Sequence, residues 1–191
     1  MRKRIIAFLP FLMIFTFAYS QPDYKERKNE PMKVLVVYYS LTGNTELVAK
    51  TIAEMLRADI RRVEEVKQRK KGIGLFISGG YAAFRNKCSE IKPIDYNLSG
   101  YDLIFLGSPI WAGKCVPAIN TFIKNADFKD KKVVCFFTME SKNYQGAVKN
   151  MTDKIVAKSG TVIGSFAIRA GKSSIEERIS KTKEAVSKYI K

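Results

Sequence analysis

Histidine is absent from the 191-residue chain. Without an imidazole, Ser-His-Asp and Cys-His catalysis are excluded, and zinc loses its commonest nitrogen ligand. Cysteine is scarce as well: Cys88, Cys115 and Cys135 are an odd number without paired spacing, which argues against a disulfide framework or a zinc site. No arginine lies six positions after any cysteine, so the loop of cysteine-dependent phosphatases is also missing. Cys135 lies in an apolar run and is expected to be a small core residue.

Acidic side chains are few: 18 Asp and Glu stand against 34 Lys and Arg, which gives a formal net charge of +16. Such a charge favours acidic proteins, anionic membranes or nucleic acid as partners, although a solvated basic surface is the simpler alternative. Basic residues are spread over most expected helices and form no stripe interleaved with aromatics, which argues against nucleic-acid binding. The length and the 46% hydrophobic content predict one folded domain.

The first 31 residues are expected to lie outside that domain. A cationic start at residues 2–4 precedes an apolar stretch at 5–18, so residues 1–20 are interpreted as a signal peptide cleaved after Ser20, or as a retained membrane anchor. Residues 21–31 are polar and are interpreted as a linker. This pattern predicts an exported or membrane-associated protein. Translation starting at Met32 would instead give a complete cytoplasmic protein.

From Val34 onward, apolar runs typical of buried strands alternate with segments of helical periodicity. Five strands alternating with five helices predict an α/β fold, a doubly wound parallel sheet with helices on both faces. A ligand in such a fold binds at the carboxyl ends of the strands, where the strand order reverses. The strands are expected at 34–39, 60–66, 101–107, 132–137 and 161–168, and the helices at 46–57, 72–87, 117–125, 146–159 and 175–190.

The loop after the first strand is the clearest candidate site. It presents hydroxyl groups and backbone N–H groups at the start of a helix, where the helix dipole favours an anion. It contains no lysine or arginine, so a phosphate is expected to be held there by neutral hydrogen bonds. It lacks the lysine of a Walker A loop and the three glycines of a dinucleotide loop, while ordinary helix capping is the alternative. The loop comprises Ser40, Leu41, Thr42, Gly43, Asn44 and Thr45.

Two further loops, 108–116 and 138–145, are expected to converge with 40–45 at the carboxyl edge of the sheet. The first of them carries the only tryptophan, Trp111, among the small residues Ala112 and Gly113. A tryptophan flanked by small residues suits a planar ring that also needs backbone hydrogen bonds. A tryptophan buried for packing alone is the alternative.

Residues 32–191 resemble the flavodoxin family. The family signature of two aliphatics, an aromatic, Ser or Thr, a small residue and Thr is filled by Val36, Val37, Tyr38, Ser40, Gly43 and Thr45. Gly107 to Trp111 is similar to the second flavin loop of that family. The resemblance implies strand order 2-1-3-4-5 and one non-covalently bound FMN, with its 5′-phosphate in the first loop.

The cofactor-binding residues implied by the resemblance come from all three loops. In the third loop, Thr138 is implied to contact the flavin and Tyr144 to stack on it, but the Gly-rich pattern common there is displaced to Gly146. An ordinary surface loop therefore stays open as the alternative. Glu140 is expected to influence the redox potential of the flavin by its position. The full set is Ser40, Leu41, Thr42, Gly43, Asn44, Thr45, Ser108, Pro109, Ile110, Trp111, Ala112, Gly113, Thr138, Glu140 and Tyr144.

In function, the resemblance implies an electron-transfer protein in which FMN carries the electrons and no side chain acts as acid or base. Two alternatives stay open: an FMN-dependent NAD(P)H or quinone oxidoreductase of the same superfamily, and a flavin-free binding module on this fold. The apolar stretch 72–84 and the basic charge would suit a quinone. Flavodoxins are commonly acidic, so this basic chain is expected to meet a redox partner with an acidic surface or a membrane quinone.

Overall fold

The computed structural model describes residues 31–67, 80–83, 85–140, 144–171 and 173–190. By its internal contacts the chain divides into Met1–Pro31 and Met32–Lys191. The signal or anchor segment predicted at 1–20, and the linker apart from Pro31, lie outside the described residues. Within the described ranges, no helix has both the length and the apolar character that a membrane span requires.

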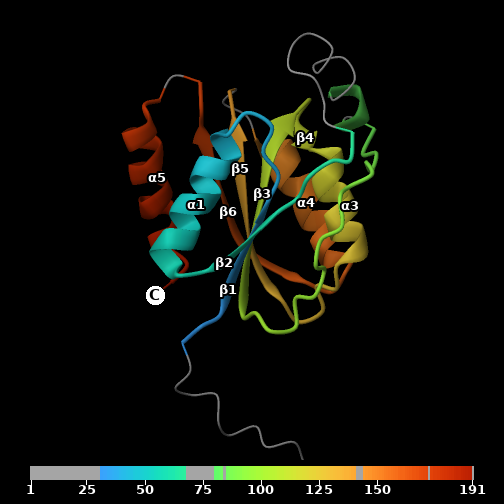
Figure 1. Ribbon diagram of the computed structural model, residues 1–191, viewed down its shortest axis with the longest axis horizontal. Coiled ribbons are helices and arrows are strands. Elements are labelled where there is room, and N and C mark those ends of the chain that lie inside the picture. The colour runs from blue at the N-terminus through green and yellow to red at the C-terminus, as the bar shows by residue number, and fades with distance from the viewer. Residues whose placement is uncertain (1–30, 68–79, 84, 141–143, 172, 191) are drawn as a thin grey trace, which may run out of the picture. The chain divides into compact units, whose positions relative to one another are not determined.

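A parallel sheet forms the centre of the domain (Figure 1). Its strand order is β2-β1-β3-β5-β6, and each neighbouring pair along this path is parallel. A short strand, β4, pairs antiparallel with the end of β3. Apart from this additional strand, which was not predicted, the order is the predicted 2-1-3-4-5. The strands are β1 Val34–Tyr38, β2 Asp59–Arg62, β3 Leu103–Trp111, β4 Lys114–Cys115, β5 Lys132–Met139 and β6 Thr161–Arg169.

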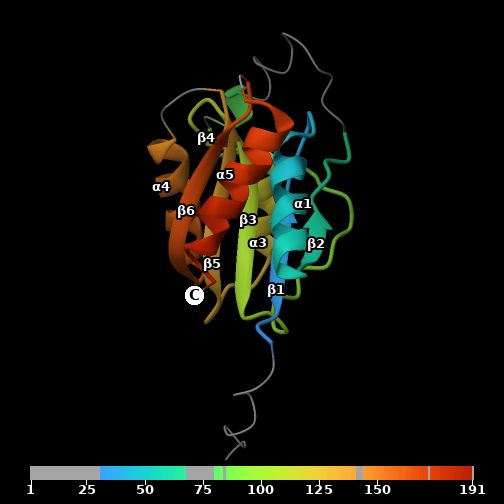
Figure 2. The same ribbon diagram turned by 90° about the vertical axis from the view of Figure 1, so that its left-hand side faces the viewer.

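Helices cover both faces of the sheet, as Figures 1 and 2 show: α1 and α5 lie on one face, α3 and α4 on the other. These helices confirm the predicted doubly wound fold. Of the helix predicted at 72–87, residues 80–83 are helical, while 68–79 and 84 lie outside the described residues. The bounds are α1 Asn44–Leu56, α3 Pro117–Asn125, α4 Gln145–Val156 and α5 Ile175–Ser187.

Strand β1 shows why its apolar run is continuous. All five of its residues are buried, and side chains along a strand alternate between the two faces. Leu35 and Val37 pack in the core that contains residues of α3 and α4. Val36 and Tyr38 pack in the second core, which contains residues of α1 and of α5. A strand buried on both faces therefore needs apolar side chains at every position.

The predicted bounds of β3 were wrong at its carboxyl end. Residues 108–111, expected in a loop, continue the strand, and only Ala112 and Gly113 form a turn, with φ of 47° and 73°. Beyond Gly107 the strand pairs with β5 and β4, whereas its pairing with β1 stops there. Pro109 lies just beyond the last residue of β3 that pairs with β1, and proline is tolerated where a strand has lost a neighbour.

Two other strands also differ from their predicted lengths. Strand β5 continues to Met139, so Thr138 lies in a strand and not in a loop. Strand β2 ends at Arg62, although the alternating pattern predicted a strand as far as Val66. Beyond β2, the chain forms an isolated antiparallel bridge between Glu65 and Ile91. Residues 63–66 therefore follow the alternating pattern without being part of a parallel strand.

Candidate functional site

The loop between β1 and α1 is built around Gly43. Its φ of 91° lies in the left-handed region that glycine occupies without steric cost. The Gly43 N–H donates to Ser40 Oγ at 3.1 Å, and the Leu47 N–H donates to the Gly43 carbonyl at 2.9 Å. Among the described residues, no side chain caps the start of α1. The first-turn N–H groups of a helix have no partner within the helix, so this end of α1 is suited to an anion.

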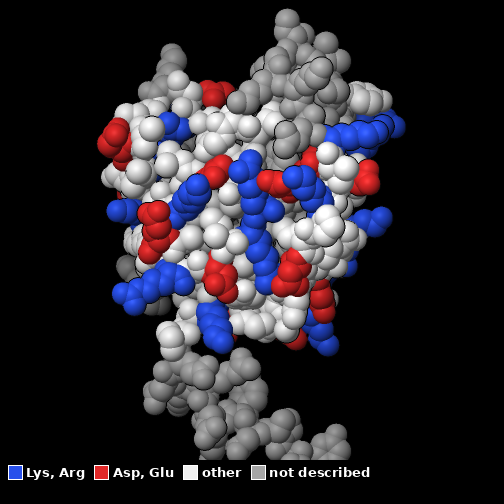
Figure 3. Space-filling model, in the orientation of Figure 1, with Lys and Arg blue, Asp and Glu red and all other residues white. Residues whose placement is uncertain are grey.

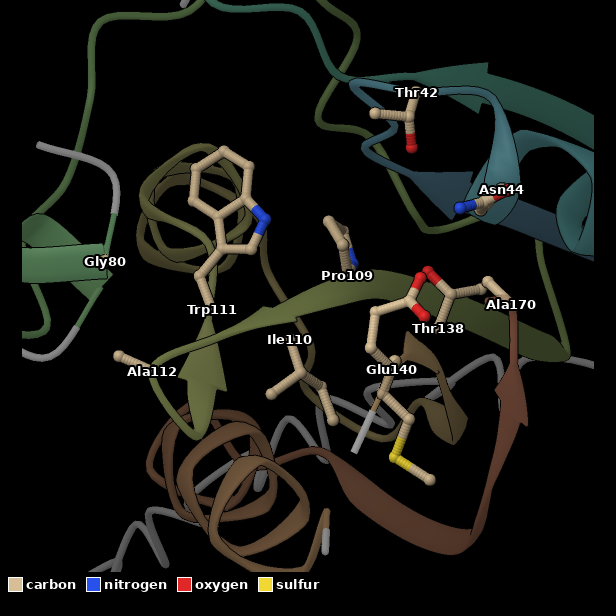
Figure 4. Close-up of a pocket in the computed structure, with 11 residues that line it drawn as sticks. Thr42, Asn44, Gly80, Pro109, Ile110, Trp111, Ala112, Thr138, Glu140 and Ala170 are labelled. Atoms are coloured by element: carbon tan, nitrogen blue, oxygen red, sulfur yellow. The ribbon is translucent and has the colours of Figure 1, made fainter. Parts of the chain in front are cut away.

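A cavity of about 400 Å³ lies at the carboxyl edge of the sheet (Figure 4). The volume falls in the range of small-molecule sites, roughly 300–1,000 Å³. The cavity brings together residues from all three predicted loops, and its position is the point where the strand order reverses between β1 and β3. The lining residues are Thr42, Asn44, Gly80, Pro109, Ile110, Trp111, Ala112, Thr138, Met139, Glu140 and Ala170.

The two sides of the cavity differ in chemistry. Figure 4 shows Thr42 and Asn44 on one side and Trp111 with Ala112 across from them. The first side joins hydroxyl and amide groups to the uncapped start of α1. The second side offers an aromatic ring and a small neighbour. Such a cavity fits an elongated ligand that has an anionic head and a planar apolar body.

Trp111 is half-buried and packs edge-on against Tyr39, with ring centroids 5.9 Å apart and an interplanar angle of 89°. The Tyr39 hydroxyl in turn donates to Glu65 Oε2 at 3.1 Å, and Glu65 is buried. Trp111 is therefore oriented by a buried pair behind it while it also lines the cavity. A tryptophan that is buried for packing alone would not be partly exposed at a cavity, as Trp111 is.

Thr45 and Thr138 join the first loop to the end of β5. Their hydroxyl oxygens lie 2.7 Å apart, and both side chains are buried. This hydrogen bond fixes the first turn of α1 against β5, and Thr138 also lines the cavity. The side chain of Thr45 does not line the cavity, so it supports the loop from the side that faces away from the cavity.

Glu140 lies at the rim of the cavity, where it is exposed. Its carboxylate lies against Gly171, at which an added Cβ would overlap the carboxylate oxygen. Because Glu140 is exposed and its carboxylate is the end of a flexible side chain, it could move aside from such a Cβ. Residues 141–143 of the predicted third loop lie outside the described residues.

Several predicted site residues do not line this cavity. Ser108 is buried, where its hydroxyl donates to the Pro109 carbonyl and accepts from the Val116 N–H. Tyr144 packs against the core that contains α3 and α4, and its stacking on a ligand stays a prediction. The remaining members of this group are Ser40, Leu41, Gly43, Thr45 and Gly113; of these, Ser40 and Leu41 border a second cavity of about 100 Å³.

Sequence reasoning missed two arginine contacts at the first loop. Arg62 of β2 donates from Nη2 to the Ser40 carbonyl at 3.3 Å. Arg178 of α5 donates from Nη1 to Asn44 Oδ1 at 2.9 Å. The loop itself contains no basic residue, but a guanidinium from a segment 134 positions away reaches it. No local pattern could indicate this pair, since helical periodicity places Arg178 only on a partly exposed face of α5. Gly80, Met139 and Ala170 also line the cavity without having been predicted.

The cysteines do not provide a reactive group at the cavity. Cys115 and Cys135 are buried, and burial raises the pKa of the Cys115 thiol to about 12 and raises that of Cys135 as well. A thiol with such a pKa stays protonated near neutral pH and is a poor nucleophile. Cys88 is exposed. In the described part of the chain, no group of three or more Cys, Asp or Glu side chains is placed to hold a metal ion.

The parallel sheet and its strand order define a doubly wound α/β protein, and the cavity at the reversal point is its candidate small-molecule site. A family model described as Flavodoxin matches residues 82–187. The chain belongs to the flavodoxin family.

Comparison with individual proteins agrees with this family. A flavoprotein from Lactobacillus acidophilus NCFM, solved in complex with FMN, has a TM-score of 0.65 and 26% identity, covering 84% of this chain and 99% of its own. The flavodoxin-like domain-containing protein BilS of Clostridioides difficile is 28% identical over 71% of this chain and 64% of its own length. An NAD(P)H dehydrogenase (quinone) of Caulobacter vibrioides is 32% identical over 49% of this chain and 46% of its own. The chain thus matches less than two thirds of each of these two relatives.

Proposed function

We propose that this protein binds one FMN non-covalently in the cavity and transfers electrons through it. The observation that carries the proposal is the pairing of an uncapped helix start with Trp111 across one cavity at the reversal point of the sheet. The FMN complex of the L. acidophilus flavoprotein, which shares the fold, supports the choice of ligand.

The donor groups fit the 5′-phosphate of FMN. The first-turn N–H groups of α1, the Thr42 hydroxyl and the Asn44 amide would hold it. Trp111 and the backbone around Ala112 would hold the ring, which needs an apolar contact and backbone hydrogen bonds. The bound flavin supplies electron transfer, while the protein binds it, orients it and limits its contact with water.

An electron carrier is favoured over an oxidoreductase because the family model that matches residues 82–187 is described as Flavodoxin. Among the described residues that line the cavity, Glu140 alone has an ionisable side chain. The partial similarity to a quinone dehydrogenase supports the second candidate, an FMN-dependent NAD(P)H or quinone oxidoreductase. The two are separated by adding NADPH and a soluble quinone to the FMN-loaded protein. If the protein is an electron carrier, NADPH should be oxidised no faster than in the presence of free FMN. Sustained turnover above that rate would establish the oxidoreductase.

The redox partner is proposed to present an acidic surface, because the chain carries a net charge of +16. On the face in Figure 3, however, Lys and Arg alternate with Asp and Glu. Basic side chains of β2 are paired in this way: Arg62 contacts Glu46 and Glu64, and Arg61 contacts Asp95. A membrane quinone as partner is a proposal that rests on the apolar stretch 72–84 and the basic charge, and an exported or membrane-associated location is a proposal that rests on the first 20 residues.

Glu140→Gln is expected to raise the midpoint potential of the bound flavin. A carboxylate at the rim of the cavity disfavours the gain of an electron, and a unit charge beside a partly hydrated site contributes about 1–2 kcal/mol. This corresponds to about 40–90 mV for a one-electron step. Spectroelectrochemical titration measures the shift. Glu54→Gln, at an exposed position on α1, is the matched control, and equal potentials for both variants would contradict the expected role of Glu140.

A further inference from the structure

Building on the proposed FMN site, we infer that Arg178 is a positioning residue that holds the side-chain amide of Asn44 with its NH₂ group toward the phosphate. Arg178 Nη1 donates to Asn44 Oδ1 at 2.9 Å. A guanidinium has donors only, so the atom that it contacts must be the amide oxygen. This contact fixes which way round the amide lies, and Figure 4 shows the Asn44 nitrogen on the side that faces the cavity.

Arg178 is itself held in place. Its Nε donates to the Ser174 carbonyl at 3.3 Å, and its side chain is half-buried. Ser174 is the N-cap of α5 and accepts a hydrogen bond from the Glu177 N–H. Helices α5 and α1 lie side by side on the same face of the sheet (Figures 1 and 2). The arginine therefore spans a fixed distance between two packed helices.

In the described part of the chain, no carboxylate lies within ion-pair distance of Arg178. The more distant Glu176 interacts with it only weakly, since Arg178 is the smallest of the influences that lower the pKa of Glu176. The neighbouring Glu177 is engaged by Lys181, with Nζ and Oε1 2.6 Å apart. An unpaired guanidinium behind a neutral amide polarises the Asn44 NH₂ group, and hydrogen bonds that gain charge in this way are stronger than neutral ones.

The arrangement has a direct consequence for ligand choice. Without Arg178, the Asn44 amide can rotate and present its oxygen to the phosphate, which is an acceptor facing an acceptor. Arg178 should therefore favour FMN over riboflavin, which lacks the phosphate, and should do so through Asn44. If Arg178 only linked α5 to α1, its removal would weaken the binding of FMN and of riboflavin equally.

The test uses the full-length chain, freed of flavin and titrated with FMN and with riboflavin. For Arg178→Gln we expect the dissociation constant for FMN to rise about tenfold, and that for riboflavin to change by less than about twofold. Arg178→Lys, which keeps a donor and the charge, should stay within about threefold of the unaltered chain for FMN. Lys183→Gln removes an exposed charge from the same helix and should leave both constants within about twofold.

A double-mutant cycle separates action through Asn44 from direct action. In an Asn44→Ala background, Arg178→Gln should weaken FMN binding by less than about threefold, because the residue that it positions is absent. Equal losses for FMN and riboflavin in Arg178→Gln, or full multiplication of the two single effects, would overturn the inference. Failure of the unaltered chain to bind FMN would instead overturn the proposed function, and the inference with it.

Discussion

Trp111→Ala is expected to weaken FMN binding about 30-fold, and riboflavin binding by the same factor. The loss of ring contact and of buried apolar area is worth about 2 kcal/mol, and each 1.4 kcal/mol is tenfold in affinity. Trp111 lines the cavity and is oriented by the edge contact with Tyr39, so the ring is held in place before a ligand arrives. Calorimetric titration of both ligands measures the effect.

The matched variant is Trp111→Phe, which keeps an aromatic ring and should lose less than about fivefold. Since Trp111 is the only tryptophan, ligand binding should also quench the tryptophan emission of the unaltered protein. Unchanged FMN affinity in Trp111→Ala would show that the ring does not contact the flavin. The pattern also differs from that of Arg178→Gln, which should affect FMN alone.

Gly107→Ala is expected to destabilise the domain by about 3 kcal/mol, the upper end of the usual cost of overpacking a core. A Cβ at this position would overlap the ring of Phe136, which lies opposite Gly107 on β5. Phe136 is fully buried and stacks on Phe166 at a centroid distance of 6.0 Å. The ring therefore covers the glycine on this face of the sheet and has no room to move aside.

For a domain of this size, about 3 kcal/mol corresponds to a melting temperature lowered by roughly 6–12 °C. Differential scanning calorimetry measures it. Gly100→Ala is the control, because a Cβ there meets no atom within 4 Å, and its melting temperature should change by less than about 2 °C. Equal melting temperatures for the two variants would contradict the close packing of Phe136 on Gly107.

The doubly wound fold and the place of the cavity were predictable because they depend on local patterns, whereas the strand order was implied by the resemblance to the flavodoxin family. The continuous apolar run 34–38 needs helices on both faces, and β1, α1 and the loop between them follow within a few positions of the predicted bounds. Trp111 was placed correctly at the edge of the sheet because parallel strands end there together. Buried runs, turn residues and helical periodicity carry this information in short windows of sequence.

What could not be predicted depends on contacts between distant segments. The extension of β3 to Trp111 needs β4 and the end of β5 as partners, and no single run of residues reveals this pairing. The contact of Arg178 with Asn44 joins α5 to α1 across 134 positions. The prediction that neutral groups alone hold a phosphate in this loop considered only the loop's own residues, and it stays a prediction.

The proposed FMN site is tested most directly by titrating the flavin-free, full-length protein with FMN and with riboflavin. The predicted result is a 1:1 complex with FMN, a shifted flavin absorption spectrum and quenched Trp111 emission. FMN should bind at least about tenfold more tightly than riboflavin, since only FMN carries the phosphate for the start of α1. An unchanged flavin spectrum with no heat of binding, or equal affinity for the two ligands, would contradict the site.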